Sequence, residues 1–551
     1  MSGSDRSSSS AFDWSQGYAS TRSPVFGRRI VSTSHPLAAQ AGLAAMLRGG
    51  NAIDAAVTAA AVMTIVEPCS NGLGSDAFAI VWDGERLQGL NASGGAPAAW
   101  TPAWFRARHG AAASTPPVRG WDAVTVPGAI AAWAALSQRY GRLPFEDLMA
   151  PAIEIAERGY AVPPIVQHKW ALAATVDELT RQPGFAPTFL PRGRAPAVGE
   201  LFALPAAGRA LRLIARTRGE AFYRGEIARD VAAHARAHGG AMTEKDLATY
   251  APEWVDLLAQ RYRDIDLHEI PPNGQGIAAL MALGMLQHFD LAALGADSAA
   301  CAHLQIEAVK LAFADVHAHV AEGQAMAARG VTAEHLLEPA YLAGRARLID
   351  PRRAQEFETG RLARGGTIYL TAADDEGRMV SLIQSNYMGF GSGVVVPPWG
   401  VSLQNRGTSF SLDAGAANVV APGRRPFHTI IPAFVTRGGQ PLMSFGVMGG
   451  HMQPQGHVQT LVRMLDHRQS PQAACDAPRW RVDGGLALGV ETHMPAATVQ
   501  GLRERGHVIA DLADSYQDFG AGQFIWRLGD PAVEGYVAAS DPRRDGAAAG
   551  W

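Results

Sequence analysis

The sequence predicts an α+β fold, a four-layer αββα sandwich with two β-sheets between outer layers of helices. Two observations lead to this prediction. Residues 25–366 show mainly helical patterns with some strands, whereas residues 367–551 are dominated by strand hairpins. A chain of 551 residues with 47% apolar residues can bury a large core. Two sheets packed between helices would join both halves in one layered unit rather than in two independent domains.

The composition excludes several classes of function. The formal net charge is -3 and no dense basic run is present, so nucleic-acid binding has no electrostatic footprint. No run of about 18 apolar residues occurs, and we expect neither a transmembrane helix nor a membrane partner. Residues 1–24 are rich in serine and lack an apolar signal-peptide core, which predicts a disordered tail and a cytoplasmic location.

No cofactor or metal site is predicted. The three cysteines, Cys69, Cys301 and Cys475, are far apart, so neither a disulfide framework nor a thiolate metal site follows. The histidines show no metal-ligand spacing such as HExxH. The glycine loop 71–76 could be mistaken for a phosphate-binding loop, but it lacks the required lysine and precedes a strand instead of a helix.

The first half begins with a strand at 25–33 and two helices. Gly49-Gly50 ends the helix 37–47, and Asn51 caps an alanine-rich helix from residue 52 to about residue 66. The further elements expected in this half are a strand at 77–82, helices within 126–161 and 162–250, a strand at 262–270, and helices from about residue 277 and over 303–320. Residues 321–366 are predicted to be helices and loop, exposed just before Thr367.

The second half opens with a hairpin that begins at Thr367. Its first strand turns at residues 375–377 and returns to Ser385. A hairpin centred on Glu376 places Thr367 and Ser385 opposite each other. A hydroxyl that follows Gly365-Gly366, with a second hydroxyl facing it, suggests a nucleophile freed by self-cleavage before Thr367. A strand that merely begins with threonine after a glycine turn would explain the same residues.

A second hairpin ends at a pair of glycines. Its strands are expected over 428–436 and 441–448, with the turn at Gly438-Gly439, and it stops at Gly449-Gly450. A short helix near 455–467 and strands to about residue 538 complete the chain.

These residues support one type of chemistry. A free α-amino group titrates near 7.7–8.0, so the freed amine of Thr367 could take the proton of its own hydroxyl at neutral pH. Ser385 could hydrogen-bond the amine or the hydroxyl and orient it. Gly449 and Gly450, at a strand end, could turn backbone N–H groups toward the developing oxyanion.

Several segments together resemble the gamma-glutamyltranspeptidase family. They are Ser34-His35-Pro36-Leu37-Ala38, Gly49-Gly50-Asn51-Ala52-Ile53-Asp54-Ala55-Ala56, Val126-Pro127-Gly128, Pro271-Pro272-Asn273-Gly274-Gln275-Gly276, Gly389-Phe390-Gly391-Ser392-Gly393 and Gly449-Gly450. The resemblance implies an N-terminal-nucleophile fold of the αββα type and self-cleavage between Gly366 and Thr367. A large subunit of residues 25–366, preceded by the tail, and a small subunit of residues 367–551 would result.

The resemblance also assigns roles to the site residues. Thr367 matches the family's nucleophile, and Ser385 matches the second threonine that supports it. Gly449 and Gly450 match the glycines of the oxyanion hole. After cleavage, the large and small subunits would stay bound to each other as a heterodimer. The sequence leaves open whether this heterodimer forms a homo-oligomer.

The positions that read glutamate in the family are largely replaced. Residues 92–97 contain no arginine to bind the α-carboxylate. The polar and acidic pair that holds the glutamyl amine falls at Arg406 and Ser409, and the serine pair that binds the α-carboxylate falls at His428-Thr429. Tyr387 replaces an asparagine and is expected to line the pocket.

Two of these replacements, Arg406 and His428, each have two interpretations. Arg406 would repel a substrate amine and favour a carboxylate, or it forms a structural salt bridge inside a loop. His428 is either a hydrogen-bonded structural histidine or a catalytic one. The residues expected to contact substrate are Arg406, Ser409, Tyr387, His428 and Thr429.

The leading functional hypothesis is a self-cleaving amidohydrolase or acylase. Its small-molecule substrate would be an amide whose acyl part carries a carboxylate but lacks the full glutamyl head, as in the branch with oxamate amidohydrolase and the glutaryl-cephalosporin acylases. One alternative is a gamma-glutamyltransferase or glutathione hydrolase with a rearranged pocket. Another is an unprocessed family member that keeps the fold without catalysis.

Overall fold

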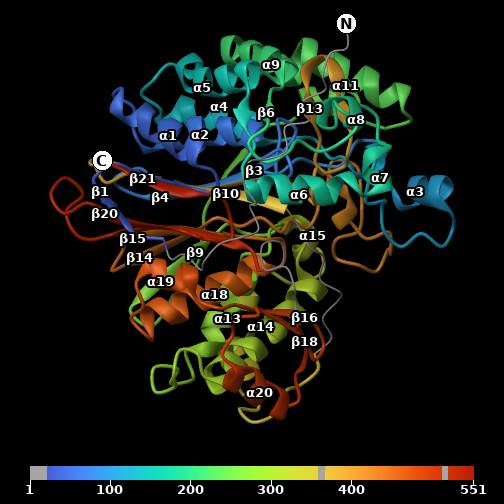
Figure 1. Cartoon of the computed structure of the whole chain (residues 1–551). Coiled ribbons are helices and arrows are strands. Elements are labelled where there is room, and N and C mark those ends of the chain that lie inside the picture. Colours follow the sequence, from blue (N-terminus) through green and yellow to red (C-terminus); the bar gives the residue numbers. More distant parts are fainter. Residues whose placement is uncertain (1–21, 358–365, 512–518) are drawn as a thin grey trace, which may run out of the picture.

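The computed structural model describes residues 22–357, 366–511 and 519–551 (Figure 1). The predicted disorder of the N-terminal tail therefore falls almost entirely outside the described residues, as do residues 358–365 of the predicted exposed loop. No helix of the described segments is long and apolar enough to span a membrane.

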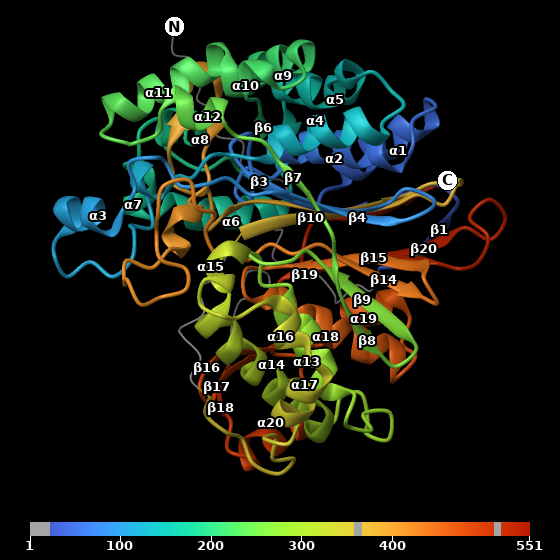
Figure 2. The same ribbon diagram turned by 180° about the vertical axis from the view of Figure 1, so that it is seen from behind.

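Two seven-stranded sheets form the centre of the molecule. The sheet nearer the top of Figure 1, here the upper sheet, has the order β21(Ala547–Gly550), β2(Ile30–Thr33), β10(Gly366–Ala373), β11(Met379–Tyr387), β3(Asp76–Trp82), β4(Leu87–Ala92) and β7(Glu253–Val255). The lower sheet has the order β1(Val25–Gly27), β20(Tyr536–Ser540), β19(Ala521–Arg527), β15(Gln440–Met448), β14(Ala433–Arg437), β9(Ile265–Glu269) and β8(Leu258–Tyr262). Helices cover the outer face of each sheet, which confirms the α+β prediction (Figures 1 and 2).

Apolar side chains from both sheets fill the space between them. Phe78, Ile80 and Ile383 of the upper sheet share one buried cluster with Phe434 and Ile525 of the lower sheet. Each sheet thus buries one face against the other and its second face under helices, which explains why nearly all positions of β3, β10 and β11 are buried.

The upper helical layer is built on α2(Ala52–Val66), all of whose residues are buried. Small alanine side chains let α1(Pro36–Leu47), α4(Ala129–Tyr140) and the upper sheet approach it closely. Asn51 caps α2 together with Asp54, as its sequence position predicts. The other helices on this side are α3(Pro102–His109), α5(Phe145–Arg158), α6(Pro164–Ala174), α7(Asp177–Thr180), α8(Phe185–Phe189), α9(Pro205–Thr217), α10(Glu220–Arg224), α11(Glu226–Ala237) and α12(Glu244–Ala248).

The lower helical layer is built on α13(Ile277–Leu286) and α14(Ala299–His319), which pack together beneath the lower sheet. It also contains α15(Gly323–Ala327), α16(Ala333–Leu337), α17(Pro339–Ala346), α18(Met452–Leu465), α19(Pro471–Asp476) and α20(Ala496–Glu504). A small sheet of β16(Trp480–Gly484), β17(Ala487–Val490) and β18(Val508–Asp511) lies at the edge of this layer. Short strand pairs, β5(Tyr160–Ala161) with β6(Leu201–Phe202) and β12(Val395–Val396) with β13(Val401–Ser402), join loops.

Strands from both sides of residue 366 alternate in both large sheets. In the upper sheet β10 and β11 lie between β2 and β3, and in the lower sheet β14 lies between β9 and β15. A cut before Thr367 would therefore leave two pieces that share both large sheets and the lower helical layer, held together by hydrogen-bonded ladders and a common core.

The register of the first hairpin agrees with the sequence prediction. Thr371 pairs with Ser381 and Ile368 with Gln384, which centres the hairpin on Glu376. The pairing shifts between Gly366 and Ile368, so an irregularity lies at the predicted cut.

Three strand boundaries differ from the prediction. The predicted strand 25–33 is two strands, and β1 and β2 belong to different sheets. The predicted strand 262–270 is the second half of a hairpin, because Arg263 adopts a φ of 53° and turns the chain between β8 and β9. The strand expected from residue 428 begins only at Ala433, since Pro432 has no N–H to donate to a ladder.

The contact between the two sheets can be tested at Gly446. A Cβ there would lie 2.5 Å from Cε2 of Tyr369, whose hydroxyl is held 2.7 Å from that of Ser381. Gly446→Ala should therefore lower the free energy of unfolding by about 1–3 kcal/mol. Urea unfolding of the variant and the wild type measures the change.

Gly344→Ala in α17 is the matched control. No atom lies within 4 Å of its added Cβ, so the change should be neutral or slightly stabilising. Unchanged stability of Gly446→Ala would contradict the close contact between the sheets.

Candidate functional site

The two predicted hydroxyls meet at the open end of the first hairpin. Thr367 Oγ1 lies 3.1 Å from Ser385 Oγ, and both side chains are buried. Ser385 donates its proton to the carbonyl oxygen of Gly366 at 2.7 Å and accepts the N–H of Tyr387, also at 2.7 Å. Because the Ser385 proton is used in this way, the hydroxyl of Thr367 is the donor between the two side chains. Ser385 therefore contacts both groups that a cut at this bond would involve.

The predicted oxyanion glycines lie at the end of β15, in the facing sheet. Thr371 bonds Ser444 at 2.5 Å, and the ring of Tyr369 lies against Gly446. Tyr369 and Thr371 thus face the other sheet, whereas the irregularity between Gly366 and Ile368 interrupts the regular alternation at Thr367. Contacts through His428 join the glycine pair to the hydroxyl pair. Nε2 of His428 lies 3.0 Å from Asp76, which pairs with Ser385 across the upper sheet, and its carbonyl oxygen accepts the N–H of Gln275, whose side chain donates to the carbonyl oxygen of Gly450.

Both glycines have conformations that other residues rarely adopt. The φ angles are 120° at Gly449 and 62° at Gly450, and a Cβ on Gly449 would lie 2.9 Å from Cα of Gly520. Among the described residues, neither N–H has a hydrogen-bond acceptor. Two backbone donors at the end of β15 are therefore free to bind an oxygen atom.

Gln275 holds the glycine turn and was not predicted as a site residue. Its amide nitrogen donates to the carbonyl oxygens of Thr429 and Gly450, at 2.7 and 2.9 Å. Its amide oxygen lies 3.0 Å from Nδ1 of His451. The motif that contains Gln275 was part of the family resemblance, and a polar side chain just before an apolar helix was the signal that could have identified it.

Asp76 is the second residue that sequence reasoning missed. It pairs with Ser385 across β3 and β11, is fully buried, and lies 3.0 Å from Nε2 of His428 and 3.8 Å from Nε of Arg406. Burial raises the pKa of Asp76 to about 7, although the nearby Arg406 charge opposes the shift. An acidic residue that opens an otherwise apolar strand was the available signal.

His428 is a neutral hydrogen-bond donor to Asp76. Burial, and then the charge of Arg406, lowers the pKa of His428 well below its usual value. Its Nδ1 accepts the N–H of Ile430 at 3.4 Å, which leaves the proton on Nε2, facing the carboxylate. The structural interpretation of His428 accounts for all of these contacts.

Arg406 forms a buried cluster with its neighbours. Its Nη1 donates to Thr429 Oγ1 at 2.8 Å, and its guanidinium carbon lies 4.3 Å from the ring centre of Tyr387. Burial lowers the pKa of Arg406 to about 10, while Asp76 and Tyr387 act in the opposite direction. Within the described segments Nη2 has no hydrogen-bond partner. Arg406 thus forms an ion pair with Asp76 through Nε, and its Nη2 group is left for a ligand.

Ser409 completes this group of predicted contacts. It ends the short 3-10 turn η3(Arg406–Ser409), and its hydroxyl lies beside the phenol of Tyr387. The five predicted substrate contacts therefore form one cluster next to the hydroxyl pair, because Tyr387 pairs with Gly366 across the hairpin.

A cavity of about 230 Å³ borders the predicted cut. Gly366 forms part of its wall, together with Cys69, Ser70 and Gly389. Thr367 itself does not line it, because the hydroxyl faces the interior of the sandwich and the residue is 1% exposed.

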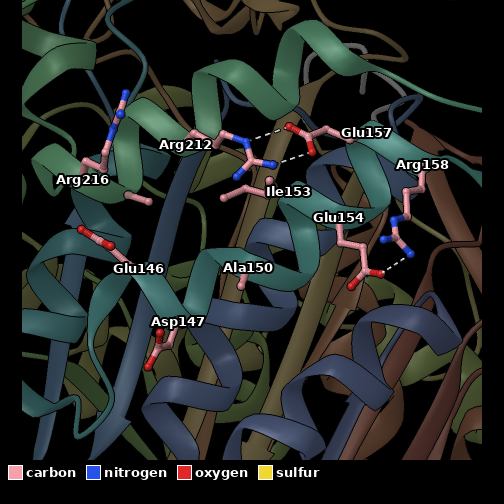
Figure 3. A pocket seen from close by; sticks show the side chains of 10 residues that line it. Glu146, Asp147, Ala150, Ile153, Glu154, Glu157, Arg158, Arg212 and Arg216 are labelled. Atoms are coloured by element: carbon pink, nitrogen blue, oxygen red, sulfur yellow. Dashed lines mark hydrogen bonds and ion pairs between the residues drawn. The ribbon is translucent and has the colours of Figure 1, made fainter.

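A larger hollow of about 600 Å³ lies elsewhere, between α5 and α9 (Figure 3). Arg212 points across it and pairs with Glu157, and Glu154 pairs with Arg158 on the same helix. None of the predicted site residues lines this hollow. Its charged side chains largely pair with one another, as on an ordinary solvated surface.

One group of metal-ligating side chains is brought together by the fold. His303 and Glu307 are one turn apart on α14, and with His507 their ligand atoms lie within 4.8 Å of one another. The ammonium group of Lys310 already lies 2.8 Å from Glu307, so a positive charge is present at this place. The cluster is accounted for as a buried ionic network.

The arrangement of these groups indicates a class of protein. Paired hydroxyls at the start of an internal strand, with two free backbone N–H groups nearby, are the equipment of a hydrolase or transferase that acts on acyl groups. The model of the gamma-glutamyltranspeptidase family matches residues 38–551, and the chain belongs to this family. The predicted family membership is therefore confirmed.

Relatives within the family carry different activities in their names. The chain is 35% identical to the oxamate amidohydrolase proenzyme of Klebsiella pneumoniae, over 94% of this chain and 97% of the relative. It is 34% identical to the glutathione hydrolase-like YwrD proenzyme of Bacillus subtilis, over 96% and 99%. The crystal structure of cephalosporin acylase from Bacillus halodurans is 45% identical, with a TM-score of 0.92 over 98% of this chain and 99% of that one.

The buried carboxyl group of Asp76 predicts a pH dependence of stability. Its pKa is raised from 3.8 in the unfolded chain to about 7 in the fold. The folded protein therefore keeps a proton that the unfolded chain loses, and this contribution to stability is lost as pH rises from about 4 to about 7. Asp76→Asn should remove that part of the slope, which is at most about 1.4 kcal/mol per pH unit.

Urea unfolding of both proteins between pH 4 and pH 8 measures the difference. Asp177→Asn is the control, because Asp177 forms an exposed pair with Arg181 one turn away. If the unfolding free energy of Asp76→Asn falls with pH as steeply as that of the wild type, other groups cause the pH dependence.

Proposed function

We propose that the chain is a self-cleaving amidohydrolase or acylase with Thr367 as its nucleophile. The observation that supports this most directly is the contact of Ser385 with both the hydroxyl of Thr367 and the carbonyl oxygen of Gly366. The two sheets and their helical covers would be the αββα sandwich of the N-terminal-nucleophile type, divided into residues 1–366 and 367–551.

Self-cleavage would use the geometry of the uncut chain. Oγ1 of Thr367 attacks the carbonyl carbon of Gly366 as its proton moves toward Ser385, and the C–N bond between the two residues breaks. The amine of Thr367 takes a proton, and water then hydrolyses the ester to free the carboxylate of Gly366. Ser385 donates to the carbonyl oxygen on which negative charge develops.

The mature reaction would use the freed amine as the base. It removes the proton of Oγ1, which attacks the amide carbon of the substrate, and returns that proton to the departing nitrogen. The N–H groups of Gly449 and Gly450 stabilise the oxyanion. Water hydrolyses the resulting ester between Thr367 and the acyl group.

The substrate would carry a carboxylate on its acyl part. The free Nη2 of Arg406 and the hydroxyls of Thr429 and Ser409 are the groups proposed to contact it, with Tyr387 as the pocket wall. His428 would act through Asp76 and hold Arg406 in place. The names of the acylase and amidohydrolase relatives support this class of substrate.

Gamma-glutamyl transfer or glutathione hydrolysis is the second candidate. The relative named as glutathione hydrolase-like, which aligns with nearly the whole chain, favours it. The surroundings of Ser93 favour the first candidate. This serine lies in the segment where the family's arginine is absent, and its hydroxyl is engaged by Asn91 and Asn273, at 2.8 and 3.1 Å. The cytoplasmic location and a homo-oligomer stay predictions.

Self-cleavage is tested by variants of the hydroxyl pair. Thr367→Ala should stay as one intact chain, because no hydroxyl is left to attack Gly366. Ser385→Ala should cleave at least about tenfold more slowly, because it loses the hydrogen bonds to the hydroxyl of Thr367 and to the carbonyl oxygen of Gly366. Denaturing electrophoresis with N-terminal sequencing follows both, and the wild type should give a fragment that begins at Thr367.

Ser381→Ala is the matched control, since it removes a hydroxyl from the same strand that bonds Tyr369 instead. Its rate of cleavage should equal that of the wild type. A wild-type chain that stays intact after prolonged incubation would favour the unprocessed, non-catalytic alternative.

The acyl specificity is tested with a panel of substrates. We expect kcat/KM for a glutaryl anilide or for oxamate to exceed that for a gamma-glutamyl anilide by about tenfold or more, equivalent to about 1.4 kcal/mol in transition-state binding. The physical reason is that Arg406 stands where an acidic side chain would attract the substrate amine. Strong preference for the gamma-glutamyl compound would establish the second candidate.

A further inference from the structure

The cavity beside the predicted cut is lined by positive charge. Arg119, Lys169 and Arg544 all reach its wall, and no acidic side chain is among its described lining residues. The cavity has a volume of about 230 Å³, which suits a small molecule or part of one. Three cations around such a cavity attract an anion.

Lys169 is the cation that most needs a partner. It projects from α6, is half-buried, and makes no hydrogen bond or ion pair with any residue in the described part of the chain. Burial, and then the charge of Arg544, lowers the pKa of Lys169 to about 8. The attraction of a bound anion would offset both of these unfavourable effects.

Arg119 is positioned by the hairpin side of the cavity. Its Nη1 donates to the carbonyl oxygens of Gly389 and Gly391. Both glycines belong to the loop that follows β11, so the guanidinium is anchored to the same hairpin that carries Ser385.

The neighbouring carboxylates are already engaged elsewhere. Glu67 accepts the hydroxyls of Ser34 and Ser70, at 2.6 and 2.7 Å. Asp545 accepts the backbone N–H groups of Ile165 and Val166, at 3.2 and 2.9 Å. Neither lines the cavity, and neither hydrogen-bonds Lys169 or Arg119 within the described part of the chain.

The cavity lies on the amine side of the reacting bond. Gly366 is in its wall, so the bond from the Thr367 nitrogen to Gly366 leads toward it. Once that bond is cut, the freed amine faces the space that Gly366 occupied. The departing nitrogen of a substrate must come within hydrogen-bond reach of this amine to take its proton. The predicted acyl contacts, Arg406 and Tyr387, do not line this cavity.

We propose that Lys169, with Arg119 and Arg544, binds a carboxylate on the amine half of the amide substrate. This inference rests on the proposed function and extends it from the acyl half to the leaving group. When the C–N bond of the substrate breaks, the nitrogen receives the proton held by the Thr367 amine. The departing product is then an amino acid or another amine with a carboxylate.

Two substrates that differ only in this carboxylate test the proposal. Glutaryl-4-aminobenzoate should have a kcat/KM at least about tenfold above that of glutarylanilide, the usual size of one charge-assisted contact. Lys169→Gln should lose most of this ratio. Lys245→Gln, at an exposed lysine of α12, should behave as the wild type.

A binding measurement keeps the result independent of turnover. Calorimetric titration of the cleaved protein with 4-aminobenzoate should show affinity that falls about tenfold in Lys169→Gln, with electrophoresis showing that the variant still cleaves itself. Equal binding by both proteins, or a wild-type ratio of kcat/KM near one, would overturn the subsite. Lys169-dependent binding without hydrolysis of either amide would contradict the proposed glutaryl-type substrate and support the subsite.

Discussion

The candidate site depends on the position of β10 between the two sheets. The strand is paired on both edges, with β2 and β11, and its inward-facing side chains contact β15 of the other sheet. The ring of Tyr369 against Gly446 leaves no room for β10 to shift relative to β15. The pairing with β11 then brings the hydroxyl of Thr367 to 3.1 Å from that of Ser385.

Burial of charge is the second constraint on the site. Asp76 lies in the upper sheet without access to water. His428 and Arg406, which come from loop and turn segments later in the chain, lie beside its carboxyl group. A carboxylate of this kind is stable only with such partners, and the guanidinium in turn holds Tyr387 and Thr429. The same cluster therefore balances a buried charge and shapes the proposed acyl pocket.

The proposed enzyme has positive charge on both sides of its nucleophile. Arg406 stands on the acyl side, and Lys169 with its neighbours stands on the side of the scissile glycine. An amide with negative charge at both ends would match this pattern. Relatives of the chain carry names as different as oxamate amidohydrolase and cephalosporin acylase, so membership of the family does not by itself identify the substrate.

The sequence by itself determined the local features and the family. The hairpin register followed from the alternating pattern and the turn at residues 375–377, and the cap at Asn51 followed from short-range hydrogen bonding. Only the tertiary structure placed Asp76 beside His428, and Lys169 beside Arg544, because these pairs are joined by neither periodicity nor a turn. Their contacts arise from the stacking of layers, where the cost of burying charge selects partners from distant segments.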